Sequence, residues 1–347
     1  MLPHIGTLAA GEGNAITDVP GVLVGHVTRA DGPVQTGVSV VLPHAGDLYR
    51  DRVPAAAVVL NGFGKSIGLL QLDELGVLET PVALTNTFAV PTVATAQIRQ
   101  CIAANPEVGR SQPTVNPLVF ECNDGYLNDL QRMAVTAQDY QDALAAAGPV
   151  VAQGAVGAGR GMSCFGIKGG IGSASRQAGG HCVGALVLAN FGREGQCLWA
   201  GQPLGPVLQQ RLAAAGVPAA AGAAPEKGSI IMLLATNAPL DARQLRRLAL
   251  RAGAGLARTG SVFGHGSGDI ALAFSTAFTV PQDPRRPMPN LRLLHDALLD
   301  PLFQAAADAT EQAILHALWH AQTVQGRDGH TRWALRALLP ELEQPTR

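Results

Sequence analysis

Short apolar runs and longer segments with helical spacing alternate along most of the chain. The apolar runs are bounded by glycine, proline or asparagine and predict strands at residues 21–27, 37–42, 55–60, 81–84, 117–120, 183–190, 229–236 and 270–275. Leucine and alanine recur at helical spacing between them, which predicts helices at about residues 65–75, 91–104, 138–147, 239–258 and 290–324, the last with a break at Asp300-Pro301. This alternation predicts an α/β fold.

A glycine-rich segment, residues 154–180, interrupts the alternation. Its glycines do not fit the GxGxxG pattern that leads into a helix. Lys168 precedes its glycines, whereas the lysine of a GxxxxGK[ST] phosphate loop follows them. Glycine at this density is more typical of tight turns or of backbone that approaches a site closely. We therefore predict either tight turns or backbone close to a site here, and the support for phosphate binding is weak.

The segment 216–240 changes character at its middle. Residues 216–228 are small, broken by proline and without periodicity, which predicts a mobile surface linker, and residues 229–236 form an unbroken apolar run that predicts a buried strand. Ser229 is the first residue of that strand. A serine in this position is suited to self-cleavage, because its hydroxyl can attack the carbonyl of Gly228 and convert the peptide bond to an ester that water then hydrolyses.

Cleavage there would give Ser229 a free α-amine beside its own hydroxyl. An α-amino group titrates near about pH 8, well below a lysine, so that at neutral pH it can act as the base that activates the hydroxyl. The segment therefore predicts an N-terminal-nucleophile hydrolase.

Two other predicted strands end in polar side chains. The residues ECNDGYLND at 121–129 follow the strand at 117–120, and strand ends commonly carry binding groups, although a structural Asn-Asp-Gly turn explains them equally. Asn190 ends the strand at 183–190, where an asparagine is either a turn former or a donor to an oxyanion.

Other nucleophiles and metal sites have weaker support. Gly-Ser dipeptides end at Ser173, Ser229, Ser261 and Ser267, but only Ser229 follows a pliable segment and begins a buried strand. Ser267 lacks the GxSxG elbow, and a triad with its neighbours His265 and Asp269 is disfavoured because residues so close in one loop rarely reach the required geometry. The pair His316 and His320 could face a metal, but neither an HExxH glutamate nor a third ligand accompanies it.

Composition excludes several function classes. The net charge of -1, with 15% charged and 4% aromatic residues, provides no basic field for nucleic acid. The amino terminus lacks a signal-peptide pattern and no apolar run reaches membrane-spanning length, so we expect a cytoplasmic protein with no membrane partner. Five cysteines without CxxC spacing predict buried free thiols. A 47% hydrophobic content suffices for one large core, and nothing requires two domains.

Six motifs spread along the chain are distinctive when taken together. They are GVLVGHVT, VLNGFGKSIGLLQLDELGVLETPVALTNT, ECNDGYLND, GMSCFGIKGGIGSASR, GSIIMLLATNAPL and RTGSVFGHGSGDIALAFST. Through them the sequence resembles the DmpA family of L-aminopeptidase/D-esterases, which also contains the β-peptidyl aminopeptidases. The resemblance covers nearly the whole chain and is highly specific.

The resemblance implies one catalytic domain over residues 1–347 that cuts itself between Gly228 and Ser229 into residues 1–228 and 229–347. It also implies a four-layer α-β-β-α sandwich, similar to Ntn-hydrolases but different in connectivity. A homotetramer of processed units is the expected assembly.

The site residues that the resemblance implies are carried over motif by motif. Ser229 matches the nucleophile, Asn190 the oxyanion-hole amide, and Tyr126 a tyrosine lining the active site. Ser267 and Asp269, in GSGD, match a serine and an acid that orient the nucleophile and its amine.

The anchor for the substrate ammonium group is expected to be Asp124 or Glu121, because an aminopeptidase needs a carboxylate to select a free amino terminus. Three residues depart from the family pattern: Arg160 stands where a small or hydroxyl residue is expected, His265 where asparagine is usual, and Asn237 where an acid is common. These departures leave substrate preference open, above all if Arg160 projects into the pocket.

The expected activity is release of the first residue from short peptides, amino acid amides or esters through an acyl-enzyme on Ser229, with no metal or organic cofactor. Two alternatives remain open: a self-cleaving acyltransferase similar to ornithine acetyltransferases, and an uncut scaffold without catalysis. The order of preference among L-α-amino, D-amino and β-amino substrates is also open.

Overall fold

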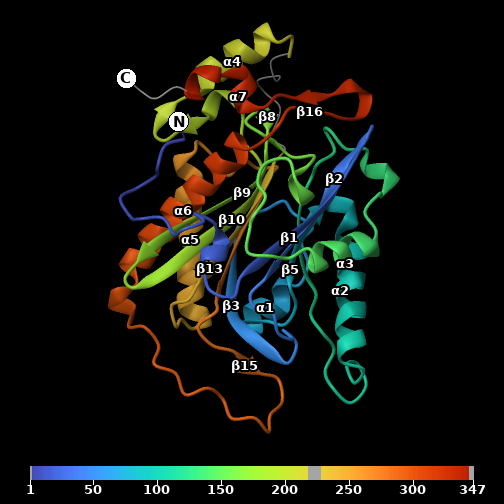
Figure 1. Ribbon diagram of the computed structural model, residues 1–347, viewed down its shortest axis with the longest axis vertical. Coiled ribbons are helices and arrows are strands. Elements are labelled where there is room, and N and C mark those ends of the chain that lie inside the picture. Colours follow the sequence, from blue (N-terminus) through green and yellow to red (C-terminus); the bar gives the residue numbers. More distant parts are fainter. Residues whose placement is uncertain (1, 218–227, 344–347) are drawn as a thin grey trace.

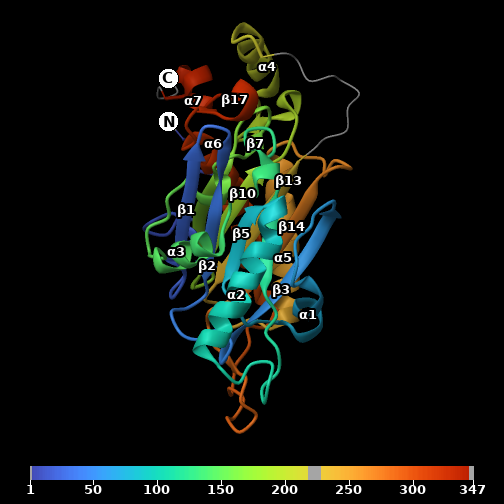
Figure 2. The ribbon, with the colours of Figure 1, turned by 90° about the vertical axis from the view of Figure 1, so that its right-hand side faces the viewer.

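The computed structural model describes residues 2–217 and 228–343, and these form four layers (Figures 1 and 2). One sheet has the order β1-β2-β5-β6. Its strands are β1 (Leu23–Asp31), β2 (Val34–Leu42), β5 (Val82–Asn86) and β6 (Leu118–Cys122). Helices α2 (Val90–Ala104) and α3 (Ala137–Ala145) cover its outer face.

The second sheet has the order β15-β3-β14-β13-β10-β9, with β4 paired to β3. Its strands are β3 (Asp51–Gly62), β4 (Val77–Leu78), β9 (Gly170–Ala178), β10 (His181–Asn190), β13 (Ser229–Thr236), β14 (Gly268–Ser275) and β15 (Val280–Pro281). Helices α5 (Ala242–Arg258) and α6 (Asp300–Trp319) cover its outer face. The order of layers confirms the α-β-β-α sandwich.

Shorter elements connect or cap these layers. They are α1 (Leu69–Leu75), α4 (Gly205–Ala214) and α7 (Leu335–Leu338), with the two-residue strands β7 (Ser163–Cys164), β8 (Ile167–Lys168), β11 (Leu198–Trp199), β12 (Gln202–Pro203), β16 (Val324–Gln325) and β17 (Thr331–Arg332). The hairpin β16–β17 lies at the same end of the molecule as α4 and α7 (Figure 1).

Strand β13 is buried on both faces. Ile231 and Leu233 pack between the two sheets, and Ile230 and Met232 pack toward α5 and α6. A strand with two buried faces loses the alternation of polar and apolar residues. The unbroken apolar run at 229–236 therefore predicted this strand correctly, whereas the predicted linker before it falls largely on residues 218–227, which lie outside the described residues.

Two predictions of secondary structure were wrong. Residues 170–178 form strand β9, so the tight-turn interpretation of the glycine-rich segment is wrong for these residues. Gly172 of β9 lies against α6, where a side-chain Cβ would come within 1.9 Å of the Ala313 carbonyl oxygen. The helix expected from residue 290 begins at Asp300, because Pro301 occupies the first turn, where a missing N–H costs nothing. Residues 290–295 are irregular.

The five cysteines are free and buried, which confirms the prediction from their spacing. No helix in the described part of the chain is both long and apolar enough to cross a membrane.

Candidate active site

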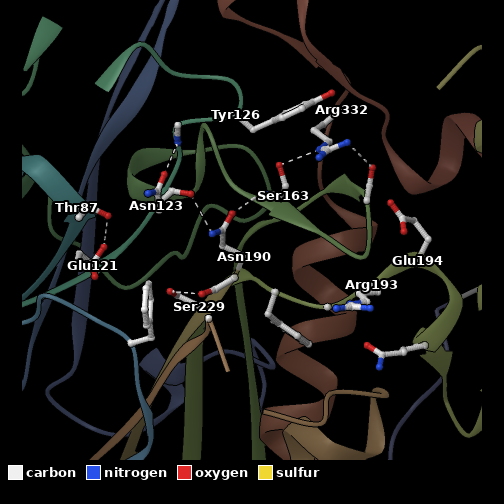
Figure 3. A pocket seen from close by; sticks show the side chains of 18 of the residues that line it. Thr87, Glu121, Asn123, Tyr126, Ser163, Asn190, Arg193, Glu194, Ser229 and Arg332 are labelled. Carbon is white, nitrogen blue, oxygen red and sulfur yellow. Dashed lines mark hydrogen bonds between the residues drawn. The ribbon is translucent and has the colours of Figure 1, made fainter. Parts of the chain in front are cut away.

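A cleft of about 1180 Å³ opens where β10 ends and β13 and β14 begin (Figure 3). The three strands bring distant residues into register, since Asn190 pairs with Ser229 on one side and Gly268 pairs with Ser229 on the other. The end of β6 contributes Glu121 to the same cleft. Pairing within the second sheet, together with the packing of the first sheet against it, therefore assembles three of the predicted polar strand ends in one place.

Ser229 lies at the floor of this cleft and is 4% exposed. Its hydroxyl donates a hydrogen bond to the carbonyl oxygen of Gly228 at 2.5 Å. The backbone N–H of Gly268 donates to that same oxygen at 3.2 Å and to the Ser229 hydroxyl at 3.3 Å. In the uncut chain, the hydroxyl thus touches the peptide group that it would attack, and a backbone donor faces the oxygen on which charge would develop.

The side chain of Asn190 has a fixed orientation. Its Oδ1 accepts the backbone N–H of Ser163 at 2.8 Å, and its Nδ2 donates to the carbonyl oxygen of Asn123 at 3.0 Å. Because an amide nitrogen carries two hydrogens, one remains available for a ligand in the cleft. The amide is therefore held ready to donate to an oxyanion.

Ser267 and Asp269 flank Gly268 at the start of β14. The Ser267 hydroxyl donates to Oδ1 of Asp269 at 2.6 Å, and both side chains are buried. The carbonyl oxygen of Ser267 also accepts from Nδ2 of Asn61 at 2.5 Å. This pair accordingly lies at the start of the strand next to Ser229, with its geometry fixed.

Tyr126 lines the cleft and is held by the C-terminal hairpin β16–β17. The His330 ring stacks on the tyrosine ring at 4.6 Å between centroids, and His330 Nδ1 hydrogen-bonds to the Tyr126 carbonyl oxygen at 2.8 Å. The guanidinium of Arg332 lies 3.6 Å from the centre of the same ring. The orientation of Tyr126 thus depends on residues about 200 positions away.

The two candidate ammonium anchors have different surroundings. Glu121 lines the cleft, accepting the backbone N–H of Lys65 at 2.8 Å and a hydrogen bond from the Thr87 hydroxyl. Asp124 is 1% exposed, accepts from Nδ2 of Asn128 at 3.0 Å and is not among the residues that line the cleft. The geometry favours Glu121.

The buried carboxyl of Asp124 makes the stability of the fold depend on pH. Desolvation raises its pKa to about 7, against the smaller opposing effects of its hydrogen bonds and the charge of Lys168. Between about pH 4 and pH 7 the folded protein therefore keeps a proton that the unfolded chain has lost, so that this contribution to stability is present at low pH and disappears as the pH rises.

We expect the free energy of unfolding of wild type, relative to Asp124→Asn, to fall by about 4 kcal/mol from pH 4 to pH 8. The neutral amide has no proton to lose, which is why it serves as the reference. Urea unfolding of both proteins at several pH values measures this difference. Parallel pH profiles would show that the carboxyl is ionised throughout the range.

The three departures from the family pattern lie in different places. Arg160 donates to Gln35 Oε1 at 2.7 Å and is absent from the cleft lining, so it does not narrow the pocket. His265 lines the cleft, with its ring 6.1 Å from that of Phe63. Asn237 follows the far end of β13 and accepts the N–H of Cys182 at 2.8 Å.

Two residues considered for other chemistry have structural contacts. Lys168 is fully buried and donates to the carbonyl oxygens of Gly159, Met162 and Gly169, which fixes the loop that carries Ser163. Nδ1 of His316 hydrogen-bonds to the Ser173 carbonyl oxygen at 2.6 Å, and burial lowers its pKa to about 4. Within residues 2–217 and 228–343, no group of three potential metal ligands occurs.

Several cleft residues were not found from the sequence. Ser163 and Thr87 lie inside quoted motifs, but nothing in their spacing predicts that they contact Asn190 and Glu121. Glu194 and Arg332 also line the cleft, and Arg332 lies in the C-terminal tail, outside every motif. Only the tertiary fold brings them to the site.

Comparison with known proteins identifies the family of this chain. The model of peptidase family S58 matches residues 14–332. A beta-peptidyl aminopeptidase, BapA of Sphingosinicella microcystinivorans, is 40% identical over 342 residues, an alignment that covers 92% of this chain and 85% of the relative.

Two solved structures are similar over almost their whole length. The PH0078 protein from Pyrococcus horikoshii OT3 is 44% identical, with a TM-score of 0.88 and 98% of each chain covered. The l-aminopeptidase d-ala-esterase/amidase from Ochrobactrum anthropi is 34% identical, with a TM-score of 0.86 and 98% and 97% covered. The latter is described as a prototype for the serine aminopeptidases and a new variant among the Ntn hydrolase fold, in agreement with the fold class expected here.

Proposed function

This chain belongs to peptidase family S58 and is a serine aminopeptidase, and we propose that its nucleophile is the hydroxyl of Ser229, exposed when the chain cuts itself after Gly228. The contact between the Ser229 hydroxyl and the Gly228 carbonyl, at the start of a strand paired with Asn190, carries the proposal.

Self-cleavage begins with attack of Ser229 Oγ on the carbonyl carbon of Gly228. The N–H of Gly268 stabilises the charge that develops on the carbonyl oxygen, which it already contacts. The C–N bond breaks, the nitrogen takes a proton and becomes the α-amine of Ser229, and an ester remains. Water hydrolyses the ester and leaves a carboxylate on Gly228.

Peptide hydrolysis repeats this chemistry on a substrate. The Ser229 amine takes the hydroxyl proton, Oγ attacks the carbonyl of the substrate's first residue, and Asn190 Nδ2 with the Gly268 N–H holds the oxyanion. The departing amine receives the proton and an acyl-enzyme forms. Water, activated by the same amine, then releases the first residue.

The remaining groups support these steps. Ser267 and Asp269 orient the nucleophile and its amine from the neighbouring strand, and Tyr126 steadies the tetrahedral intermediate or the leaving group. Glu121 binds the substrate ammonium group, because it lies near the end of β6 and its carboxylate lines the cleft.

The substrates that fit this site are short peptides, amino acid amides and esters with a free amino terminus. The relatives named beta-peptidyl aminopeptidases extend the proposed class to β-amino acids. We further propose a single catalytic unit that assembles as a homotetramer in the cytoplasm without a nucleic-acid partner. The net charge of -1 supports the absence of a nucleic-acid partner. The free buried cysteines support the cytoplasmic location.

The test is to sequence the amino terminus of the smaller chain and to identify the reaction product. We expect the sequence SIIML and release of a free amino acid from a dipeptide, in an assay that also contains hydroxylamine as a competing acceptor. Transfer to hydroxylamine with little release to water would favour the acyltransferase alternative. An active preparation that consists of one unbroken chain would exclude the proposed nucleophile.

A further inference from the structure

Arg332 is a charged side chain in the cleft that lacks an acidic partner. Its Nε donates to the Ser163 hydroxyl at 3.0 Å and its Nη1 to the Gly166 carbonyl oxygen at 3.2 Å, and both partners are neutral. None of the ion pairs among the described residues includes Arg332. A partly buried cation without a direct ion pair is stabilised when a ligand supplies a negative charge in contact with it.

The surroundings of Arg332 hold it in one orientation. The two hydrogen bonds fix one edge of the guanidinium, and the Tyr126 ring lies against its face at 3.6 Å. Nη2 makes no hydrogen bond to a described residue. Burial lowers the pKa of Arg332, and the charge of Glu194 partly opposes this. The guanidinium is thus preorganised and partly desolvated, and its Nη2 donor is available to a ligand.

Arg332 lies close to the catalytic groups. Its partner Ser163 donates through the backbone N–H to Asn190, so that only one residue separates the guanidinium from the proposed oxyanion donor. Figure 3 shows Glu121 and Arg332 on opposite sides of Asn190 and Ser229. The cleft therefore has a negative group on one side of the nucleophile and a positive group on the other.

We propose that Arg332 binds the C-terminal carboxylate of the substrate, so that the enzyme prefers short peptides with both ends free. This inference rests on the proposed function, because it takes Ser229 as the nucleophile and Glu121 as the ammonium site. A guanidinium is suited to this role, since its planar array of N–H donors matches the geometry of a carboxylate.

The experiment compares two substrates that differ only at the far end. The first is a dipeptide X-Ala with a free carboxylate and the second is its amide X-Ala-NH2, where X is the residue released fastest from its p-nitroanilide. Wild type is expected to prefer the carboxylate by about 10- to 100-fold in kcat/KM, the range of one charge-assisted contact. In Arg332→Gln this ratio should fall to about 1, and in Arg332→Lys it should be intermediate.

The ratio separates carboxylate binding from a positioning role. If Arg332 only holds Tyr126 and Ser163, Arg332→Gln will slow both substrates equally and the ratio will stay at its wild-type value, which would overturn the proposal. A wild-type ratio near 1 would overturn it as well. Neither outcome touches the proposed function, which is tested separately by the amino terminus of the smaller chain and by whether wild type releases X from any substrate.

Arg327→Gln is the matched control. Arg327 also lines the cleft, but it is already engaged by Asp328 at 2.6 Å and by the Gly125 carbonyl oxygen at 2.7 Å. The ratio should therefore remain within about twofold of wild type. A loss of preference in this variant equal to that in Arg332→Gln would mean that the general positive potential of the cleft, and not Arg332, selects the carboxylate.

Discussion

Ser229→Ala should yield one uncut chain of 35.8 kDa that releases no residue from any peptide. The substitution removes the oxygen that is proposed to attack Gly228 and, with it, the proposed route to the free amine. We expect activity to fall by about 10⁴-fold or more, as when other catalytic serines are removed. A denaturing gel and the intact mass report the cleavage, and release of p-nitroaniline from an amino acid p-nitroanilide reports the activity.

Ser261→Ala is the matched control, because Ser261 also follows a glycine and is also buried, yet it does not line the cleft. Its hydroxyl accepts only the N–H of Phe263, at 3.3 Å. This variant should be cut and active. Two chains in a preparation of Ser229→Ala would contradict the assignment of the nucleophile.

Asn190→Ala should lower kcat by about 10²- to 10³-fold and change KM less, because a donor to the oxyanion acts mainly in the transition state. The chain should still be cut. In the uncut protein the Gly228 oxygen is held by the Gly268 N–H, so self-cleavage does not depend on the Asn190 amide alone. Steady-state kinetics and a denaturing gel measure the two effects separately.

Asn237→Ala provides a comparison at the other end of the β10–β13 strand pair. Asn237 accepts a backbone hydrogen bond from Cys182 far from the cleft, and its removal should lower stability without reducing kcat. An Asn190→Ala enzyme with kcat within threefold of wild type would exclude Asn190 from the oxyanion hole.

The sequence predicted the strands whose buried positions are occupied by apolar residues. All eight predicted strands are present, and the run at 229–236 matches β13 because both of its faces pack against apolar layers. The sequence did not predict β9, which carries polar residues in buried positions. Ser173 donates a hydrogen bond to the Ala185 carbonyl oxygen, and Arg176 donates to the Ile5 carbonyl oxygen and to Gln312 Oε1. Hydrogen bonds of this kind replace the apolar pattern by which a strand is recognised.

The candidate site was predictable only in part. Ser229 and Asn190 stand at strand ends, which the sequence reveals, but their pairing follows from strand order, which it does not. Glu121 and Asp124 are three residues apart, equally acidic and both buried, and only the fold shows that Glu121, within β6, lines the cleft while Asp124, in the turn that follows, does not. Arg332 reaches Tyr126 through a contact between residues distant in sequence, for which no local pattern exists.

The strand order of the second sheet determines what the proposed cut would do to the molecule. β13, β14 and β15 belong to residues 229–347, and β3, β9 and β10 belong to residues 1–228. β14 pairs with β3 and β13 pairs with β10, so the later piece is interleaved within the earlier one. The two chains could separate only if the backbone hydrogen bonds of both the β13–β10 pair and the β14–β3 pair were broken. The two chains would therefore remain associated after cleavage. The cut would create the α-amine at residue 229 without separating the strands that hold it in place.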